Sequence, residues 1–233
     1  FFEIASAQIN KFNEELCGDS IISHKNGVSS TVILSDGLGS GVKANILATL
    51  TSRIISVMLK NGCDLDDVVE TLIETLPTCS YRKLAYSTFS VAQLHNSGKV
   101  HLVEYDNPPA ILVKNNKIFP IKYDTLNIRG KNINEAVIPL ELGDWLILMS
   151  DGEVHAGIGG VWNLGWSWER IAEFIERIIQ KPLTAHELAY ELTNIAKQLY
   201  ADKPGDDTSV AVIKIREKRK IKVLIGAPTK KDL

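Results

Sequence analysis

Aspartates next to glycine stand where apolar segments of this chain end. Residues 32–37 read Val-Ile-Leu-Ser-Asp-Gly, and residues 146–152 read Leu-Ile-Leu-Met-Ser-Asp-Gly. Four positions share the pairing with glycine, and their aspartates are Asp19, Asp36, Asp151 and Asp206, the last followed directly by Asp207. A single Asp-Gly pair is most simply a turn. Four of them bordering predicted core strands indicate a common site, because converging carboxylates repel one another unless cations neutralise them.

The residue types narrow the kind of cation that such a site would bind. Carboxylate and carbonyl oxygens suit hard cations such as Mg²⁺ or Mn²⁺. Glycine has no Cβ, so Gly37 would let a backbone carbonyl or a water molecule approach a metal ion. The five histidines are scattered, and no two of the three cysteines have the CxxC spacing of a zinc or redox site. The sequence therefore predicts an all-oxygen metal site.

The glycine-rich segment 37–44 raises a nucleotide site as an alternative. It reads Gly-Leu-Gly-Ser-Gly-Val-Lys-Ala, which lacks both the glycine spacing and the final hydroxyl of a P-loop. It also lies in no βαβ unit, which a dinucleotide fingerprint requires. Because neither nucleotide motif is matched, we prefer the metal interpretation.

Hydrophobic periodicity predicts the elements that position these carboxylates. Alternation and turn pairs such as Asn26-Gly27 predict hairpins, and apolar residues three and four apart predict amphipathic helices. The predicted strands are 21–23, 28–35, 86–95, 99–105, 110–114, 117–121, 136–140, 144–150 and 209–215, and the predicted helices are 42–60, 64–76, 168–179 and 185–200. Because hairpins dominate, we expect an α+β fold with mostly antiparallel sheets in one domain.

The composition is that of an ordinary globular protein, with 233 residues, 45% of them hydrophobic and 23% charged. A formal net charge of −2 gives no reason to expect binding to nucleic acid or to a membrane. No apolar run reaches the roughly 18 residues of a membrane span, and the first residues do not read as a signal peptide. The widely spaced cysteines fit reduced thiols, so we expect a cytoplasmic protein.

Six segments, in this order and spacing, resemble the metal-dependent serine/threonine phosphatases of the PPM (type-2C) superfamily, in the bacterial SpoIIE-like subfamily. They read CGDS, LSDGLGSGVKA, YSTFSVAQL, DNPPAILVKNNK, LELGDWLILMSDG and GDDTSVAVIKI. The resemblance implies two packed, mostly antiparallel β-sheets flanked by α-helices. It makes residues 1–216 the phosphatase domain and leaves 217–233 as a basic tail, in which 221–225 would suit one extra edge strand.

The same resemblance implies roles for the aspartates. Asp36 would bridge two Mn²⁺ or Mg²⁺ ions, and the carbonyl of Gly37 would bind one of them. Asp151 and Asp206 would complete the coordination of the first ion, and Asp19 would bind the second ion directly or through water. These residues would act in catalysis through a metal-bound water.

The activity implied is hydrolysis of phosphoserine or phosphothreonine by that water, with no covalent phosphoenzyme. Asp207 would lie beside the ligands rather than among them. The substrate would be a phosphoprotein in a bacterial regulatory switch, such as an anti-sigma-factor antagonist. A catalytically weak or silent partner-binding regulator on the same fold, and a phosphatase of small molecules, stay open as alternatives.

Helices 42–60 and 64–76 come directly after Asp36, so a shift of the first helix would shift the carboxylate. We therefore expect contacts of these helices, with a partner or with a second copy in a homodimer, to control activity.

Two further segments have alternative interpretations. Residues 106–109 read as a tight turn, with a substrate contact as the alternative. Residues 155–166 are a candidate lid, unless Trp162 and Trp166 pack against the last helices. His155 is either a proton donor near the metals or a surface or capping residue.

Overall fold

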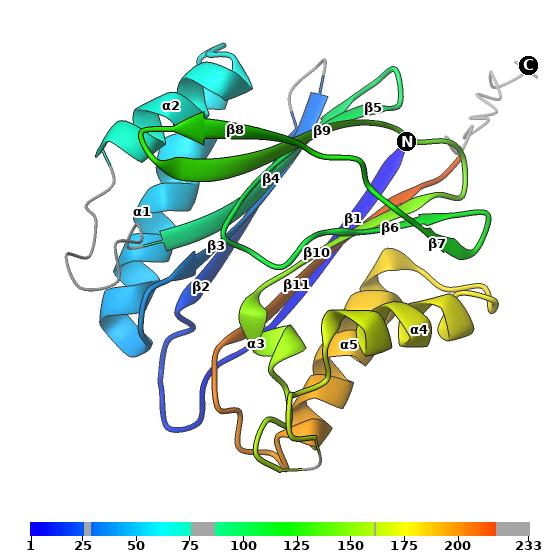
Figure 1. Cartoon of the computed structure of the whole chain (residues 1–233). Helices are drawn as coiled ribbons and strands as arrows, with labels where there is room; N and C mark the ends of the chain where they lie inside the picture. The colour runs from blue at the N-terminus through cyan, green and yellow to red at the C-terminus, as the bar shows by residue number, and fades with distance from the viewer. Residues whose placement is uncertain (26–28, 76–86, 161, 218–233) are drawn as a thin grey trace, which may run out of the picture.

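Two antiparallel β-sheets pack face to face in the computed structural model, which describes residues 1–25, 29–75, 87–160 and 162–217 (Figure 1). In spatial order, the first sheet comprises β1 (Phe2–Ile9), β11 (Thr208–Ile215), β10 (Trp145–Met149), β6 (Ile111–Lys114) and β7 (Lys117–Phe119). The second comprises β2 (Asp19–Lys25), β3 (Ser29–Gly37), β4 (Ser87–His95), β5 (Lys99–Tyr105), β9 (Lys131–Pro139) and β8 (Asp124–Ile128). The predicted α+β fold of two antiparallel sheets is confirmed.

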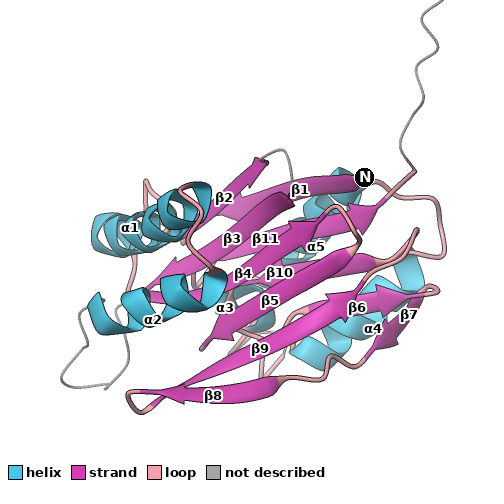
Figure 2. Ribbon diagram, turned by 90° about the horizontal axis from the view of Figure 1, so that it is seen from above, coloured by secondary structure: helices cyan, strands magenta, loops and turns pink. Residues whose placement is uncertain are grey.

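Helices cover the outer face of each sheet, as Figure 2 shows from above. The second sheet carries α1 (Gly41–Lys60) and α2 (Leu65–Thr75), and the first sheet carries α4 (Trp168–Ile178) and α5 (Ala185–Leu199). The four-residue α3 (Asp151–Val154) follows β10 directly. All four predicted helices are therefore present within one or two residues of the expected bounds.

The central strands are buried on both faces. In β3, Val32 and Leu34 lie between the two sheets, whereas Ile33 packs under α1 and α2. In β10, Leu146 lies between the sheets and Ile147 packs under α4 and α5. Because both faces are covered, these strands read as continuous apolar runs. The aspartates that end them are held by the best-packed part of the molecule.

Two strands, β1 and β8, and the short helix α3 are absent from the sequence-based expectation. Strand β1 pairs with β11 at the edge of the first sheet, and β8 pairs with β9 at the edge of the second. Most of β8 is exposed, so its sequence has no apolar alternation to reveal it. The strand expected at 136–140 begins earlier, as β9. The Asn26-Gly27 turn and the extra strand expected at 221–225 lie outside the described residues.

Helix α1 is long and apolar enough to cross a membrane by length and composition, with a mean hydropathy of 1.3. In this fold its inner face lies on the second sheet, where Ala44, Ala48 and Ile55 are fully buried. A helix that packs on the core of a folded domain can have this length and hydropathy as well, so these two properties do not make α1 a membrane span. Its outer face leaves Val42 and Ile46 more than half exposed.

Candidate active site

The predicted aspartates meet at one edge of the molecule, where strands of both sheets end. Asp19 at the start of β2 lies directly opposite Asp36 near the end of β3. Asp151 follows β10, and Asp206 precedes the neighbouring strand β11. The first sheet thus contributes two carboxylates and the second sheet two. The sequence-based expectation that four strand ends converge is correct.

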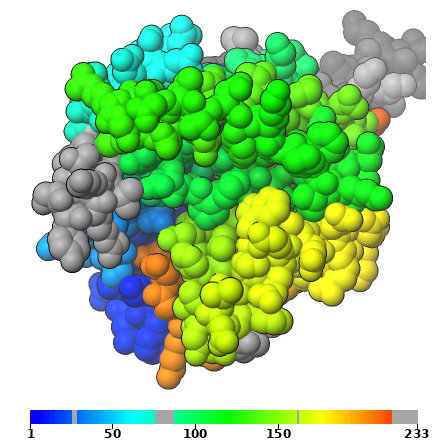
Figure 3. All heavy atoms as spheres, in the orientation of Figure 1, coloured from blue at the N-terminus to red at the C-terminus, as the bar shows by residue number. Residues whose placement is uncertain are grey.

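A cleft of about 520 Å³ opens at this edge, and Asp36, Asp151 and Asp206 line it. Its rim is completed by Lys11, Gly37, Leu38, Gly39, Ser40, Ser87, Thr88 and Asp106. Asp19 does not line the cleft and is only 3% exposed. Figure 3 shows the N-terminal segment, in blue, beside the orange segment that leads into β11 at the surface. The two segments are joined by the backbone N–H of Phe12, which donates to the carbonyl of Pro204 at 2.8 Å.

Glycines beside the aspartates allow close contact between backbones. A Cβ on Gly37 would lie 2.0 Å from the carbonyl oxygen of Ala44 in α1, and one on Gly152 would lie 2.0 Å from that of Asp207. Both distances are far below van der Waals contact, so only glycine fits at these positions. The glycines therefore hold α1 and the start of β11 against the site. Whether the Gly37 carbonyl binds a metal remains a prediction.

The crowded carboxylates are not ordinary acids. Burial raises the pKa of Asp36 to about 10, and the carboxylates of Asp19 and Asp151 add to the rise. Burial likewise raises the pKa of Asp19 to about 7, and the nearby hydroxyls of Ser209 and Ser150 offset part of this rise without hydrogen bonds of normal geometry.

Asp206 shows the same effect less strongly. Its pKa is raised, first by burial and then by the charge of Asp151, while the nearby Lys11 opposes the rise. The site therefore carries more negative charge than it can hold without cations.

Buried oxygens without partners test whether these residues suit a metal ion. Within the described chain, both carboxylate oxygens of Asp19 and Oδ2 of Asp207 are buried and accept no hydrogen bond. Such atoms are costly unless another group satisfies them. A set of carboxylate oxygens of this kind fits hard divalent cations. The donors present are therefore compatible with the predicted Mn²⁺ or Mg²⁺ site.

Asp207 has a second function in the structure. Its Oδ1 accepts a hydrogen bond of 3.0 Å from the backbone N–H of Lys11, and its side chain is 3% exposed. It thereby fastens the N-terminal segment to the start of β11. Asp207 therefore lies behind the cleft, and its place beside the metal ligands remains a prediction.

Lys11 is a residue of the cleft that the sequence does not reveal. It is the one lysine or arginine among the residues that line the cleft in the described chain. Its segment belongs to no predicted element, and it reaches the cleft through the contacts with Pro204 and Asp207 described above. No local motif marks it, because its position depends on pairing between the two ends of the domain.

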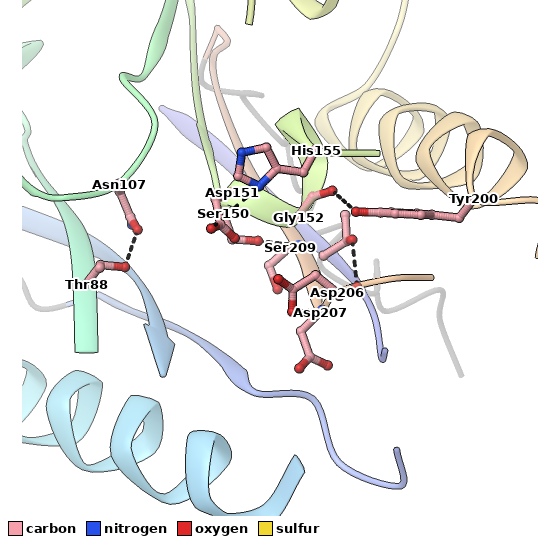
Figure 4. Close-up of polar contacts among 11 residues, drawn as sticks. Thr88, Asn107, Ser150, Asp151, Gly152, His155, Tyr200, Asp206, Asp207 and Ser209 are labelled. Carbon is pink, nitrogen blue, oxygen red and sulfur yellow. Dashed lines mark hydrogen bonds and ion pairs between the residues drawn. The ribbon is translucent and has the colours of Figure 1, made fainter. Parts of the chain in front are cut away.

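Residues 106–109, after β5, form a tight turn and also reach the cleft, where a substrate would bind. The side chain of Asn107 accepts a hydrogen bond of 2.5 Å from Thr88 (Figure 4). It also donates one of 3.1 Å to Ser90. Asp106 has a positive φ of 57°, as in a tight turn, and also lines the cleft. Thr88 lies opposite Asp36 in the sheet, so the turn is linked to the strand that carries this carboxylate.

Figure 4 shows His155 beside Asp151, with Asp206 and Asp207 near Ser209. The Nδ1 atom of His155 lies 3.7 Å from Oδ2 of Asp151, and its side chain is 48% exposed. His155 also ends the short helix α3, so it is both a capping residue and a neighbour of the predicted metal ligand. The hydroxyl of Tyr200 donates to the carbonyl of Gly152 at 2.8 Å, which fixes α3 to the end of α5.

The two tryptophans of the Gly-rich segment behave differently. Trp166 is 5% exposed and packs edge-on against Phe174 of α4, with ring centroids 5.6 Å apart. Trp162 is 37% exposed, and the guanidinium of Arg170 lies 4.1 Å from its ring centroid. Packing against the last helices is therefore correct for Trp166. A lid role for the segment is not tested by this arrangement.

Cys17 beside Asp19 is not a nucleophile. Burial raises the pKa of its thiol to about 12, and the negative charge of Asp19 adds to the rise. A thiol of this kind stays protonated at neutral pH and is inert. Cys17 and Cys63 are both free thiols.

Comparisons with known proteins identify the family and the fold of the chain. The sequence model of the family described as Stage II sporulation protein E (SpoIIE) matches residues 27–216. No curated protein sequence matches the chain. The phosphatase domain of SpoIIE from Bacillus subtilis, solved with a fragment of its regulatory domain, is 21% identical, with a TM-score of 0.76 over 92% of this chain and 63% of that chain.

Two further solved structures share the fold. The RsbU and RsbW domains of Rv1364c from Mycobacterium tuberculosis are 17% identical, with a TM-score of 0.71 over 92% of this chain and 60% of that chain. RsbX, solved in complex with magnesium, is 18% identical, with a TM-score of 0.64 over 91% of this chain and 94% of that chain.

The chain spans less than two thirds of the SpoIIE and Rv1364c structures. At these identities the solved structures establish the fold, which is that of PP2C-type phosphatase domains. The family match is broader evidence, because it runs from just before β3 to just after β11. The chain belongs to the Stage II sporulation protein E (SpoIIE) family of phosphatase domains.

Proposed function

We propose that this protein is a metal-dependent protein serine/threonine phosphatase that uses two Mn²⁺ or Mg²⁺ ions. The observation that carries the proposal is the convergence of Asp36, Asp151 and Asp206 at an open cleft, with Asp19 buried opposite Asp36. The pKa values of Asp19 and Asp36 are raised, and the buried oxygens of Asp19 lack partners. Membership of the family and the similarity to RsbX, solved with magnesium, support it.

The chain offers a coherent set of metal donors. Asp36, Asp151 and Asp206, with the carbonyl of Gly37, would hold one ion, and Asp36 with Asp19 would hold the other. When bound, the two ions would polarise the phosphoryl oxygens and lower the pKa of a water molecule that attacks phosphorus. Asp36 must lose a proton before it can serve as a ligand, because burial and its neighbours favour the protonated acid.

The other residues of the cleft would bind and orient the phosphate. Lys11 provides the positive charge at the rim of an otherwise acidic cleft, and an ammonium group there attracts a phosphoryl group. Asp207 positions Lys11 through the hydrogen bond from its backbone. Phosphoserine and phosphothreonine on a protein surface suit a cleft that is open to solvent.

We further propose that the reaction belongs to a cytoplasmic regulatory switch in a bacterium. Its substrate would be a phosphoprotein of the anti-sigma-factor-antagonist type. The Rv1364c structure, in which RsbU and RsbW domains belong to one protein, supports such a context.

Hydrolysis of p-nitrophenyl phosphate and of a phosphoserine protein tests the proposal. We would compare the wild type with Asp36→Asn in EDTA, Mg²⁺ or Mn²⁺. Activity that requires the metal and is lost in the variant is the expected result. A folded wild type that binds neither ion by calorimetry would overturn the proposal. Binding without turnover would instead favour the silent regulator, and turnover of only the small substrate would favour a small-molecule phosphatase.

A further inference from the structure

A second group of potential metal ligands lies under the N-terminal turn of α2. It consists of Asp66 from α2, His101 from β5 and Glu135 from β9, which we call the α2 cluster. One ligand atom from each residue lies within 4.8 Å of the other two. Nε2 of His101 is 4.0 Å from Oδ1 of Asp66 and makes a hydrogen bond with Oε1 of Glu135. The cluster is separate from the residues that line the acidic cleft.

The strand register explains why these side chains meet. Val100 and Leu102 of β5 lie between the sheets, so His101 points to the opposite face, toward the helices. Glu135 pairs with Val103, two residues further along β5, and therefore lies on the same face as His101. Helix α2 packs on this face and brings Asp66 from its first turn to the same point.

The geometry favours a shared ligand over two separate ion pairs. Both carboxylates approach the same ring nitrogen, and one N–H can donate well to only one of them. A neutral imidazole leaves the two carboxylates unneutralised, and a protonated one leaves a net charge of −1. No lysine or arginine of the described residues forms an ion pair with Asp66 or Glu135. A divalent cation would neutralise both carboxylates at once.

The donor types identify the class of cation. An imidazole with two carboxylates is a ligand set for borderline transition metals such as Zn²⁺, whereas Mg²⁺ prefers oxygen ligands alone. The side chains of His101 and Glu135 are 19% and 22% exposed, and that of Asp66 is 72% exposed. The cluster therefore offers three protein ligands and a side open to water, as in a four-coordinate zinc site.

We propose that Asp66, His101 and Glu135 bind Zn²⁺ or a similar transition-metal ion, which ties the first turn of α2 to β5 and β9. The proposal does not depend on the phosphatase activity. It predicts a site whose metal preference differs from that of the acidic cleft in the same chain.

Zn²⁺ titration of the tag-free full chain, with excess Mg²⁺ present to occupy the acidic cleft, tests the proposal. We expect one Zn²⁺ site in the wild type, which raises the midpoint of thermal unfolding. His101→Ala should abolish this site, and Asp66→Asn should weaken it by about 10- to 100-fold or more. Because Asp66 is exposed, the Asp66→Asn variant should fold normally even if His101→Ala does not.

Matched controls separate the site from general effects of charge. Asp67→Asn removes the same charge from the same exposed turn of α2, and His186→Ala removes an exposed histidine on α5. Both should keep the Zn²⁺ site, and so should Asp36→Asn. Absence of Zn²⁺ binding in the wild type, or equal binding in the wild type, Asp66→Asn and His101→Ala, would overturn the proposal. Loss of the site in Asp36→Asn would also overturn it, because the metal would then lie in the acidic cleft.

Discussion

The acidic cleft and the α2 cluster both gather carboxylates from separate elements, but they do so by different means. The cleft collects aspartates at strand ends, where glycines bring backbones together and burial raises the pKa of Asp36 to about 10. The α2 cluster places a helix residue over the middle of a sheet, where its carboxylates stay partly exposed. The crowded carboxylates of the cleft need cations to neutralise their charge. The imidazole of the α2 cluster instead favours transition-metal ions over Mg²⁺. The two groups of carboxylates differ in how deeply they are buried and in the imidazole of His101, which only the α2 cluster has.

The largest expected effect is the loss of phosphatase activity when a carboxylate of the acidic cleft is removed. Asp206→Asn should lower phosphatase activity with Mn²⁺ by more than about 100-fold, because even residues behind metal ligands contribute 10- to 100-fold. Asp67→Asn, on the exposed surface of α2, should leave activity unchanged. Steady-state rates at saturating metal measure both. Comparable activity in the wild type and Asp206→Asn would remove this residue from the site.

Gly37→Ala tests the backbone contact that the α2 cluster lacks. The new Cβ would meet the carbonyl of Ala44 at 2.0 Å, so we expect a loss of about 2 kcal/mol or more in the free energy of unfolding. Gly160→Ala is the control, because the nearest atom to its Cβ would be 3.4 Å away. Urea unfolding followed by circular dichroism gives both values. Equal stability of the two variants would show that α1 can shift freely away from Gly37.

Lys11→Ala tests whether the positive charge at the rim serves the substrate. We expect the KM for a phosphoserine protein to rise about tenfold, the value of one charge-assisted hydrogen bond. Lys11→Arg should restore much of the affinity, and Lys43→Ala, on the exposed face of α1, should have no effect. An unchanged KM in Lys11→Ala, measured over a full substrate range, would assign Lys11 to structure alone.

A buried carboxyl outside both groups extends the comparison to the dependence of stability on pH. Glu104 is 2% exposed, accepts a hydrogen bond from the backbone N–H of Ala110, and has its pKa raised from 4.5 to about 7 by burial. The folded state binds this proton more tightly than the unfolded state, so the stability that the group contributes is present below pH 4.5 and is lost as pH rises to 7. The loss is at most about 3 kcal/mol.

Glu104→Gln should remove this loss. The difference in stability between variant and wild type should then shift in favour of the variant from pH 5 to pH 8, as measured by urea unfolding at several pH values. A constant difference across this range would mean that Glu104 is ionised in the folded state throughout.

The two groups of carboxylates also differ in how far the sequence reveals them. Asp36 and Asp151 are visible because each ends a continuous apolar run in the same Ser-Asp-Gly motif, and local patterns of this kind survive folding unchanged. The hairpins and amphipathic helices are predictable for the same reason. Lys11 and the exposed strand β8 have no such pattern.

The α2 cluster cannot be predicted from the sequence, because it depends on how two strands pair. His101 and Glu135 are 34 residues apart and meet through the register of β5 with β9, and the sequence does not reveal the start of β9. An error of one residue in that register would place the two side chains on opposite faces of the sheet. Sites built from strand ends can thus be predicted from motifs, whereas sites built across a sheet require the pairing itself.

The carbonyl of Ala44, in the first turn of α1, packs directly against Gly37, the residue that follows Asp36. The helix has 20 residues and is therefore about 30 Å long, with Lys60 at its far end. Asp36 directly precedes Gly37, so a movement of the first turn of α1 would also displace this carboxylate. A ligand of the exposed outer face of α1 would therefore have a short route to the acidic cleft, through the contact between Ala44 and Gly37.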